Sequence, residues 1–217
     1  MPRIHGGQPT LAYATKLAKF VFSEAYTAGA SIRKWGSHKI PLEDVKKICK
    51  SAGEVLETEA NVVEFDLAEA DEQVHIVGDI HGRRGMLWAI FEDAGYPSED
   101  NPYLFLGDYV DRGDYSIEVS LILLAYKAVL KEKFFMLRGN HELMSINDKY
   151  SLKWEALFKY GSDYKTVLRE MRDAFKYLPV GALIKDTKKK ECIFAAHGGI
   201  PHRPSTIDTI NKENRKV

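Results

Sequence analysis

Short apolar runs alternate with longer amphipathic stretches through the middle of the chain. Short runs bounded by turn-forming residues are typical of strands, and apolar residues at helical spacing indicate helices. The expected strands are Asn61–Phe65, Gln73–Val77, Tyr103–Leu106, Lys133–Leu137, Val180–Lys185 and Glu191–Ala196. The expected helices are Thr10–Tyr26, Pro41–Glu57, Arg84–Ala94, Ser116–Leu130, Trp154–Tyr160 and Tyr164–Tyr177. Strands and helices in alternation predict an α/β protein whose largely parallel sheet is covered by helices.

The sequence also predicts a linker, a hairpin, the nature of the chain end and the positions of the tryptophans. Gly29–Gly36 reads as a linker, and the last two strands are expected to form a hairpin around the polar turn Asp186–Lys190. The final residues, Asn211–Val217, resemble the middle of a helix, so we expect the chain to be truncated at its C-terminal end. The tryptophans expected to pack in the core are Trp35, Trp88 and Trp154.

The charge and cysteine content of the chain argue against nucleic acid, membrane and disulfide bonds. Lys plus Arg and Asp plus Glu number 31 each among 217 residues, so the formal net charge is zero. Nothing global therefore predicts binding to nucleic acid or to an anionic membrane. The apolar stretch Ile117–Leu130 is interrupted by Glu118 and Lys127 and is shorter than the ~20 residues that a membrane span requires. Two cysteines are too few for a disulfide framework, so we expect Cys49 and Cys192 to be reduced core thiols in a reducing compartment.

Charged and glycine-rich segments follow four of the expected strands. They are Gly78–Gly82, Gly107–Gly113, Arg138–Glu142 and His197–Gly199. Glycines let the backbone turn sharply there, and carboxylate, imidazole and amide groups suit divalent first-row metals. Several carboxylates buried together without a cation would cost many kcal/mol. The sequence therefore predicts a metal centre where these loops meet, at one edge of one sheet.

The same segments resemble a known family. "GDIHG", "GDYVDRG", "RGNHE" and "HGG", in this order, are similar to the phosphoprotein phosphatases, the metal-dependent serine/threonine phosphatases of the calcineurin-like metallophosphoesterase superfamily. The resemblance implies a layered α/β/β/α sandwich with a metal site at the strand ends. It runs from about Pro41 to the end of the chain, so residues 41–217 would be a catalytic domain that lacks its C-terminal part, preceded by a lead-in of residues 1–40.

The resemblance also assigns a role to each residue of these loops. It implies two divalent ions (Mn, Fe or Zn), with Asp108 bridging both of them. The metal ligands that it implies are Asp79 and His81 on the first ion, Asn140 and His197 on the second, and Asp108. Arg112 would bind the phosphate oxygens, and Asp111 and His141 would form an acid pair at the leaving group.

The expected function is dephosphorylation of phosphoserine and phosphothreonine in proteins by a hydroxide that the two metals activate. Regulatory subunits and a location in the cytoplasm or nucleus go with this expectation, whereas nucleic acid and membrane are not expected partners. Two alternatives remain open: a small-molecule phosphoesterase, such as a dinucleoside-polyphosphate hydrolase, and a non-catalytic phosphatase-like interaction protein. The family pattern has a further histidine and a further arginine beyond His197, so we expect the second ion to bind weakly in this chain.

Overall fold

The computed structural model describes residues 1–27, 39–67, 73–199 and 206–216. Its strands form two three-stranded sheets, as the family resemblance implied, rather than the single sheet that the strand pattern alone predicted. The strands are β1 (Val62–Asp66), β2 (His75–Val77), β3 (Tyr103–Phe105), β4 (Phe134–Met136), β5 (Gly181–Asp186) and β6 (Glu191–Ala195). The first sheet has the order β2-β3-β4 and is parallel throughout. The second has the order β1-β5-β6, with β5 parallel to β1 and joined to β6 as the expected antiparallel hairpin.

The helices are close to the expected ones. They are α1 (Leu11–Phe22), α2 (Glu24–Thr27), α3 (Leu42–Thr58), α4 (Arg84–Ala94), α5 (Ser116–Leu130), α6 (Met144–Asn147), α7 (Ser151–Tyr160), α8 (Tyr164–Phe175) and α9 (Ile207–Asn211). Short 3₁₀ turns occupy Lys131–Lys133, Asn140–Glu142 and Gly161–Asp163. Helix α5 is buried along almost its whole length, which explains why its sequence reads as an apolar run rather than as an amphipathic pattern.

Two hydrophobic clusters explain why one sheet becomes two. Alternate residues of a strand point to opposite faces, and both faces of β3 and β4 are apolar. Tyr103 and Phe105 point into the large core shared with the helices, whereas Leu104 and Phe135 point into a second cluster built from strands and the residues beside them. There Phe135 stacks on Phe65 of β1 with ring centroids 4.6 Å apart.

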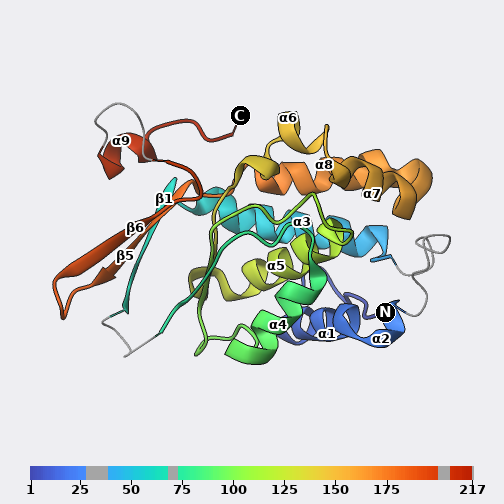
Figure 1. The fold of residues 1–217 in the computed structure, drawn as a ribbon, viewed down its shortest axis with the longest axis horizontal. Helices are drawn as coiled ribbons and strands as arrows, with labels where there is room; N and C mark the ends of the chain where they lie inside the picture. The colour runs from blue at the N-terminus through green and yellow to red at the C-terminus, as the bar shows by residue number, and fades with distance from the viewer. Residues whose placement is uncertain (28–38, 68–72, 200–205, 217) are drawn as a thin grey trace.

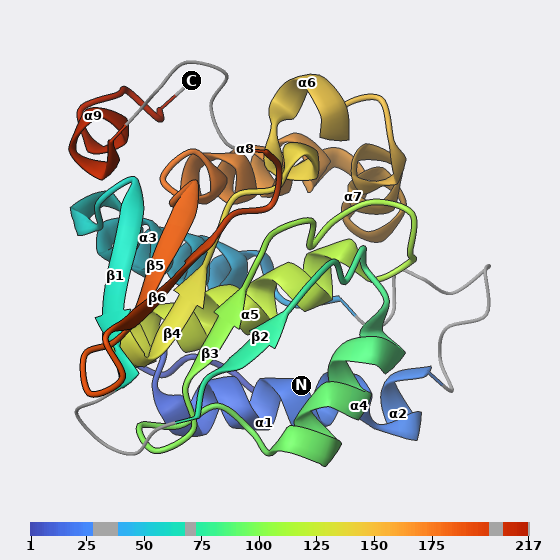
Figure 2. The ribbon, with the colours of Figure 1, turned by 60° about the vertical axis from the view of Figure 1, so that its left-hand side comes forward.

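The layers are therefore helices, first sheet and second sheet. Figure 1 shows the β5–β6 hairpin projecting at one end of the molecule, and Figure 2 shows the strands side by side with α3 and α5 behind them. This is the α/β/β part of the expected sandwich. No further layer of long helices lies on the second sheet among the described residues, and Phe194 of β6 stays 38% exposed.

The N-terminal segment packs into the same core as the rest of the chain. Helix α1 begins at the Thr10 cap, whose hydroxyl accepts a hydrogen bond from the Tyr13 backbone, and it buries Leu17 and Val21 against the main core. The boundary at residue 40 stays a prediction, and the expected linker Gly29–Gly36 lies outside the described residues. None of the described helices has the length and apolar character needed to cross a membrane.

Four expectations about single residues and the chain end were wrong. Cys192 is exposed on β6, because it lies opposite Lys185 on the face of the sheet that points away from the cluster containing Ile184, although Cys49 is buried as expected. Trp88 and Trp154 lie on the solvent sides of α4 and α7 and are 49% and 56% exposed. Trp35 lies outside the described residues.

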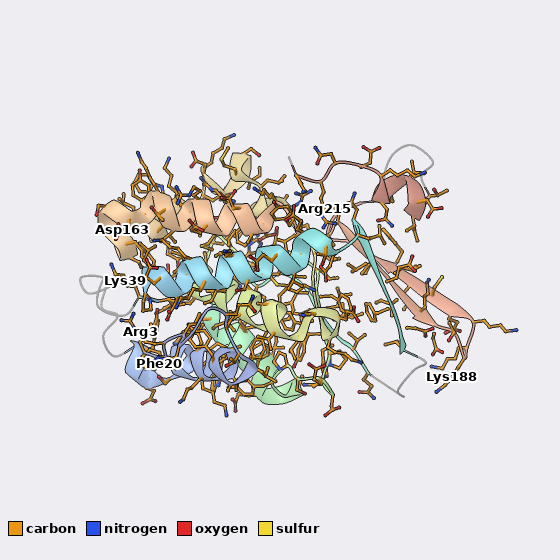
Figure 3. The ribbon with its side chains drawn as sticks, turned by 180° about the vertical axis from the view of Figure 1, so that it is seen from behind. Arg3, Phe20, Lys39, Asp163, Lys188 and Arg215 are labelled. Carbon is orange, nitrogen blue, oxygen red and sulfur yellow. The ribbon has the colours of Figure 1, made fainter. Side chains whose placement is uncertain are left out.

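The fourth wrong expectation is that the final residues, Asn211–Val217, continue a helix. Helix α9 ends at Asn211 instead of continuing, because the chain turns back and buries Arg215. The Arg215 guanidinium donates to the backbone carbonyl of Leu56, at the end of α3, with N···O 2.6 Å. Figure 3 shows Arg215 beside this end of α3 and Lys188 at the far tip of the β5–β6 hairpin.

Candidate metal centre

Four loops from two sheets meet at the candidate site. Those after β2, β3 and β4 leave the carboxyl ends of parallel neighbouring strands, and the segment after β6 joins them from the second sheet. Two groups of side chains bring possible ligand atoms within 4.8 Å of one another. They are His81, Asp108 and His141, and Asp79, Asp108 and His197. The loops thus converge as predicted, although they do not come from one sheet.

The backbone of these loops is strained. Among the described residues six non-glycine residues have positive φ, and four of them belong to this site. They are His81 (47°), Asp108 (56°), Asp111 (68°) and Arg112 (67°). Each left-handed non-glycine residue costs about 1–3 kcal/mol and persists only where its surroundings fix it. Such strain is typical of sites where side-chain direction matters more than stability.

Two glycines allow the loops after β3 and β4 to touch. A Cβ atom on Gly139 would lie 2.2 Å from Oδ1 of Asp108, and one on Gly107 would lie 2.4 Å from the Gly139 nitrogen. Both distances are far below contact distance, so side chains are excluded at these positions. The close approach lets Asp108 Oδ1 accept the backbone N–H of His141 at 3.0 Å.

The His81 ring has an unpaired nitrogen that points at carboxylates. Its Nδ1 lies 2.9 Å from the Val110 carbonyl, which can only accept, so Nδ1 carries the proton of the neutral ring. The Nε2 lone pair then faces Oδ2 of Asp79 and Oδ2 of Asp108, each at 3.5 Å. This Nε2 is buried and has no hydrogen-bond partner. A lone pair opposed to two carboxylates is unfavourable unless a metal ion, or a second proton on the ring, lies between them.

The other side of the site is more open. Nε2 of His197 lies 3.2 Å from Oδ1 of Asn140 and 3.3 Å from Oδ2 of Asp108. Its Nδ1 lies 3.8 Å from Oδ1 of Asp79. Asn140 and Asp79 are exposed, and the His197 side chain is partly buried. Asp108 therefore borders both halves of the site.

A buried His–Asp pair adjoins the metal ligands. Nδ1 of His141 lies 2.8 Å from Oδ2 of Asp111, and the other oxygen of Asp111 accepts the backbone N–H of Leu152 at 2.7 Å. Both side chains are nearly inaccessible, and the His141 ring lies edge-on to His81 with centroids 4.9 Å apart. Because Asp111 occupies Nδ1, Nε2 of His141 is the ring nitrogen left for proton transfer or for a metal.

Arg112 lies at the exposed rim of the site. Within the described residues no hydrogen bond or ion pair of its guanidinium is seen. A planar cation of this kind, with its donors unused, suits a phosphate group.

Sequence reasoning missed the part played by Glu142. Its carboxylate is buried and accepts three backbone N–H groups, from Asp108, Tyr109 and Gly139, each at 2.8 Å. Burial raises the pKa of Glu142 to about 7, and the three backbone donors oppose that rise. Glu142 stands in the quoted "RGNHE", but nothing in the sequence shows that it joins the loops after β3 and β4.

The donor set fits divalent metal ions. The oxygens and imidazole nitrogens around Asp108 match the preferences of Mn, Fe and Zn, and no thiol lies among them. The unpaired Nε2 of His81 is the specific observation that calls for a cation. The fold and these donors together define an α/β protein with a metal-binding centre at the ends of its strands.

Comparison with known proteins identifies the family. The family model described as calcineurin-like phosphoesterase matches residues 73–217, and the chain belongs to this family. The catalytic subunit of serine/threonine-protein phosphatase 4 from Saccharomyces cerevisiae is 40% identical over 187 residues, which are 86% of this chain and 56% of that protein. Serine/threonine-protein phosphatase 7 from Arabidopsis thaliana is 34% identical over 180 residues, or 82% of this chain and 42% of that protein.

A solved structure agrees with these relatives. It is a protein serine/threonine phosphatase from Saccharomyces cerevisiae with similarity to human phosphatase PP5, which matches with a TM-score of 0.75 and 27% sequence identity. The match covers 92% of this chain and 60% of that one. The chain thus spans about half the length of the curated relatives it matches.

Proposed function

We propose that this chain carries the active site of a serine/threonine protein phosphatase, a hydrolase of phosphoric monoesters. The observation that carries the proposal is the unpaired Nε2 of His81, aimed at Asp79 and Asp108 beside the buried His141–Asp111 pair. A cation site next to a proton donor is what hydrolysis of a phosphate ester requires. The names of the relatives support this reaction class.

Two divalent ions would share the site. Asp79, His81 and Asp108 would hold one of them, and Asp108, Asn140 and His197 the other. When bound, such ions make a water molecule acidic and neutralise charge on the phosphoryl oxygens. Mn, Fe and Zn all suit these donors, and the identity and number of the ions belong to the proposal.

His141 would supply the proton that the departing seryl or threonyl oxygen needs. The carboxylate of Asp111 holds Nδ1–H, so Nε2 faces the site, and the same carboxylate stabilises the positively charged ring before transfer. The Leu152 backbone N–H fixes Asp111 from its other side. General-acid help of this kind contributes roughly 10²–10⁴ in rate.

Arg112 and the exposed ligands favour a large substrate over a small enclosed one. Asp79, Asn140 and Arg112 are all exposed, so a phosphorylated side chain on a protein could reach them without entering a closed cavity. The yeast relative is named a catalytic subunit, which supports an association with regulatory subunits. A location in the cytoplasm or nucleus belongs to the same proposal.

The test is turnover by the chain loaded with Mn²⁺, measured in parallel on a phosphoserine peptide and on a dinucleoside polyphosphate. We expect phosphate release from the peptide, removed by a chelator and restored by Mn²⁺. Preferred cleavage of the dinucleotide would replace the proposal by the small-molecule phosphoesterase. Tight metal binding without turnover of either substrate would favour the non-catalytic alternative.

A further inference from the structure

A buried polar cluster connects the N-terminal segment to the loop that carries Asp111 and Arg112. We name it the loop clamp, and its members come from three helices far apart in the sequence. They are Tyr26 (α2), Glu118 (α5), Glu155 (α7) and Lys159 (α7), which are 2%, 0%, 3% and 4% exposed. None of them belongs to the metal centre, and the proposed mechanism does not use them.

Glu155 holds the start of α5, directly after the loop. Its two carboxylate oxygens accept the backbone N–H groups of Ser116 at 2.8 Å and Ile117 at 3.0 Å. A carboxylate from another helix thus satisfies two donors that a helix N-terminus leaves unpaired. The hydroxyl of Ser116 in turn accepts the backbone N–H of Asp111 at 3.0 Å. Ser116 therefore connects Glu155 to Asp111, because its backbone N–H donates to Glu155 and its hydroxyl accepts from Asp111.

Lys159 joins the two carboxylates of the clamp to the loop backbone. Its ammonium donates to Glu118 at 2.7 Å, to Glu155 at 2.8 Å and to the carbonyl of Asp114 at 3.0 Å. It also lies 4.9 Å from the centroid of the Tyr115 ring, within the range of a cation–π interaction. The Lys159 side chain thus holds both Asp114 and Tyr115, which lie between Arg112 and the start of α5.

Tyr26 brings the N-terminal segment into the cluster. Its phenol donates to the free oxygen of Glu118 at 2.6 Å, and its ring lies 6.3 Å from that of Tyr115. Burial and the nearby carboxylate of Glu118 raise the pKa of Tyr26, so the phenol remains a donor throughout the physiological range. Tyr26 therefore links the N-terminal segment, in which the sequence shows no motif, to the loop that carries Asp111 and Arg112.

Stability alone is a weak reason for such a cluster. Two carboxylates and one ammonium are removed from water, and apolar side chains of similar volume often stabilise a core as well or better. The loop in front of the cluster gives a stronger reason, because Asp111 and Arg112 are consecutive left-handed residues. Strain of this kind relaxes unless neighbouring contacts prevent it.

We propose that the loop clamp positions Asp111 and Arg112, so that the N-terminal segment, through the Tyr26 hydroxyl, helps to fix the phosphate-binding and proton-donating groups. The inference rests on the proposed function for its catalytic consequence only. The four clamp residues are positioning residues, since none of them is placed to touch a substrate. Loss of a clamp bond should loosen residues 111–117 while the metal ligands stay in place.

The experiment compares Tyr26→Phe with the matched control Tyr126→Phe in the full chain. Each change removes one hydroxyl from a buried tyrosine and keeps the ring. The Tyr126 hydroxyl also joins α5 to the N-terminal segment, through Thr15 Oγ1 at 3.1 Å, but it takes no part in the clamp. Glu155→Gln serves as a second clamp variant, in which one of the two backbone acceptors becomes a donor.

The first readout is hydrogen exchange of the backbone amides of residues 111–117, which does not depend on activity. We expect Tyr26→Phe to speed their exchange about tenfold and Tyr126→Phe to leave it unchanged, because a hydrogen bond to a charged group is lost only in the first. The second readout is the affinity of the Mn²⁺-loaded chain for inorganic phosphate, which should fall several-fold in the clamp variants with metal content unchanged.

Equal exchange in Tyr26→Phe and Tyr126→Phe, with phosphate affinity unchanged in both clamp variants, would overturn the proposal. Faster exchange spread over the whole chain would also overturn it, because that is the signature of a merely structural role. If the wild-type chain releases no phosphate from peptide but the local exchange pattern appears, the proposed function fails and the clamp stands.

Discussion

The two halves of the metal centre differ in how firmly the protein holds them. His81 and Asp108 are buried next to the His141–Asp111 pair, and close glycine packing and the Glu142 carboxylate fix their loops in spite of the strained backbone. Asn140 is exposed, and His197 enters from the second sheet with partial burial. Asp79, which would join the first half, is exposed as well. The first half is thus held by many contacts within the protein, and the second has fewer contacts to keep it in place.

This difference suggests that the two halves of the site have different functions. A buried, prearranged half binds its ion firmly, because the free energy of ordering the ligands is already supplied by folding. An open half leaves room for a phosphate group and for exchange of its ion with solvent. Asp108 is the one carboxylate shared by both groups of ligands, so it should be the residue on which both halves depend.

The largest effect is expected from Asp108→Asn, which removes the shared carboxylate. Both ions lose a charged ligand, so metal content and phosphate release should fall together to near background. Metal analysis of the purified variant, next to phosphopeptide turnover, checks this. Retention of either ion at full occupancy would show that the halves do not share Asp108.

His141→Asn should separate the chemistry from metal binding. Activity on phosphoserine peptide should drop by roughly 10²–10⁴, while metal content stays close to that of the wild type. A nitrophenyl phosphate, whose leaving group needs no proton, should suffer much less. Parallel kcat/KM values on the two substrates measure the contrast, and an equal loss on both would contradict the acid role.

Removal of metal should lower stability mainly through the buried half. A ligand present at 100 times its dissociation constant stabilises the fold by about 2.7 kcal/mol. Chelation should therefore lower the free energy of unfolding by about this amount, measured by urea denaturation with and without Mn²⁺. In His81→Ala the chelator should have almost no effect, whereas in the open-half variant His197→Ala most of the effect should remain.

The smallest effect is expected from Glu142→Gln, which tests how the buried half is fixed. A neutral amide accepts from the three backbone donors less well than a carboxylate, and its own N–H₂ opposes one of them. We expect a loss of about 1–3 kcal/mol in unfolding free energy and a weaker buried metal site. Unchanged metal affinity would mean that the glycine packing alone holds the loops.

The sequence predicted the elements of this fold better than their arrangement. Helices Arg84–Ala94 and Ser116–Leu130 were expected at the bounds observed, because the first has helical spacing and the second a long apolar run between polar ends. The apolar pattern alone could not predict the division into two sheets, which only the family resemblance implied, since an apolar run such as Tyr103–Phe105 looks the same whether its second face meets helices or another sheet. The exposure of Cys192 likewise depends on which face of its sheet is covered.

The residues that meet at the candidate site could be predicted because motif residues lie next to one another along the chain. "GDIHG" and "RGNHE" carry their chemistry locally, and the strand pattern places their ends together. Supporting contacts such as Glu155 to Ser116 join residues 39 positions apart. Such a carboxylate among the buried residues of a helix gives no periodic signal, so only the folded structure shows its partner.

We infer that one half of the site is prearranged and that the other is completed when its ion binds. The most direct test of this difference between the halves is a titration of the metal-free chain with Mn²⁺, measured by isothermal calorimetry. We expect two separate steps, a tighter one that His81→Ala abolishes and a weaker one that His197→Ala abolishes. Two ions of equal affinity, or a single step lost equally in both variants, would contradict it.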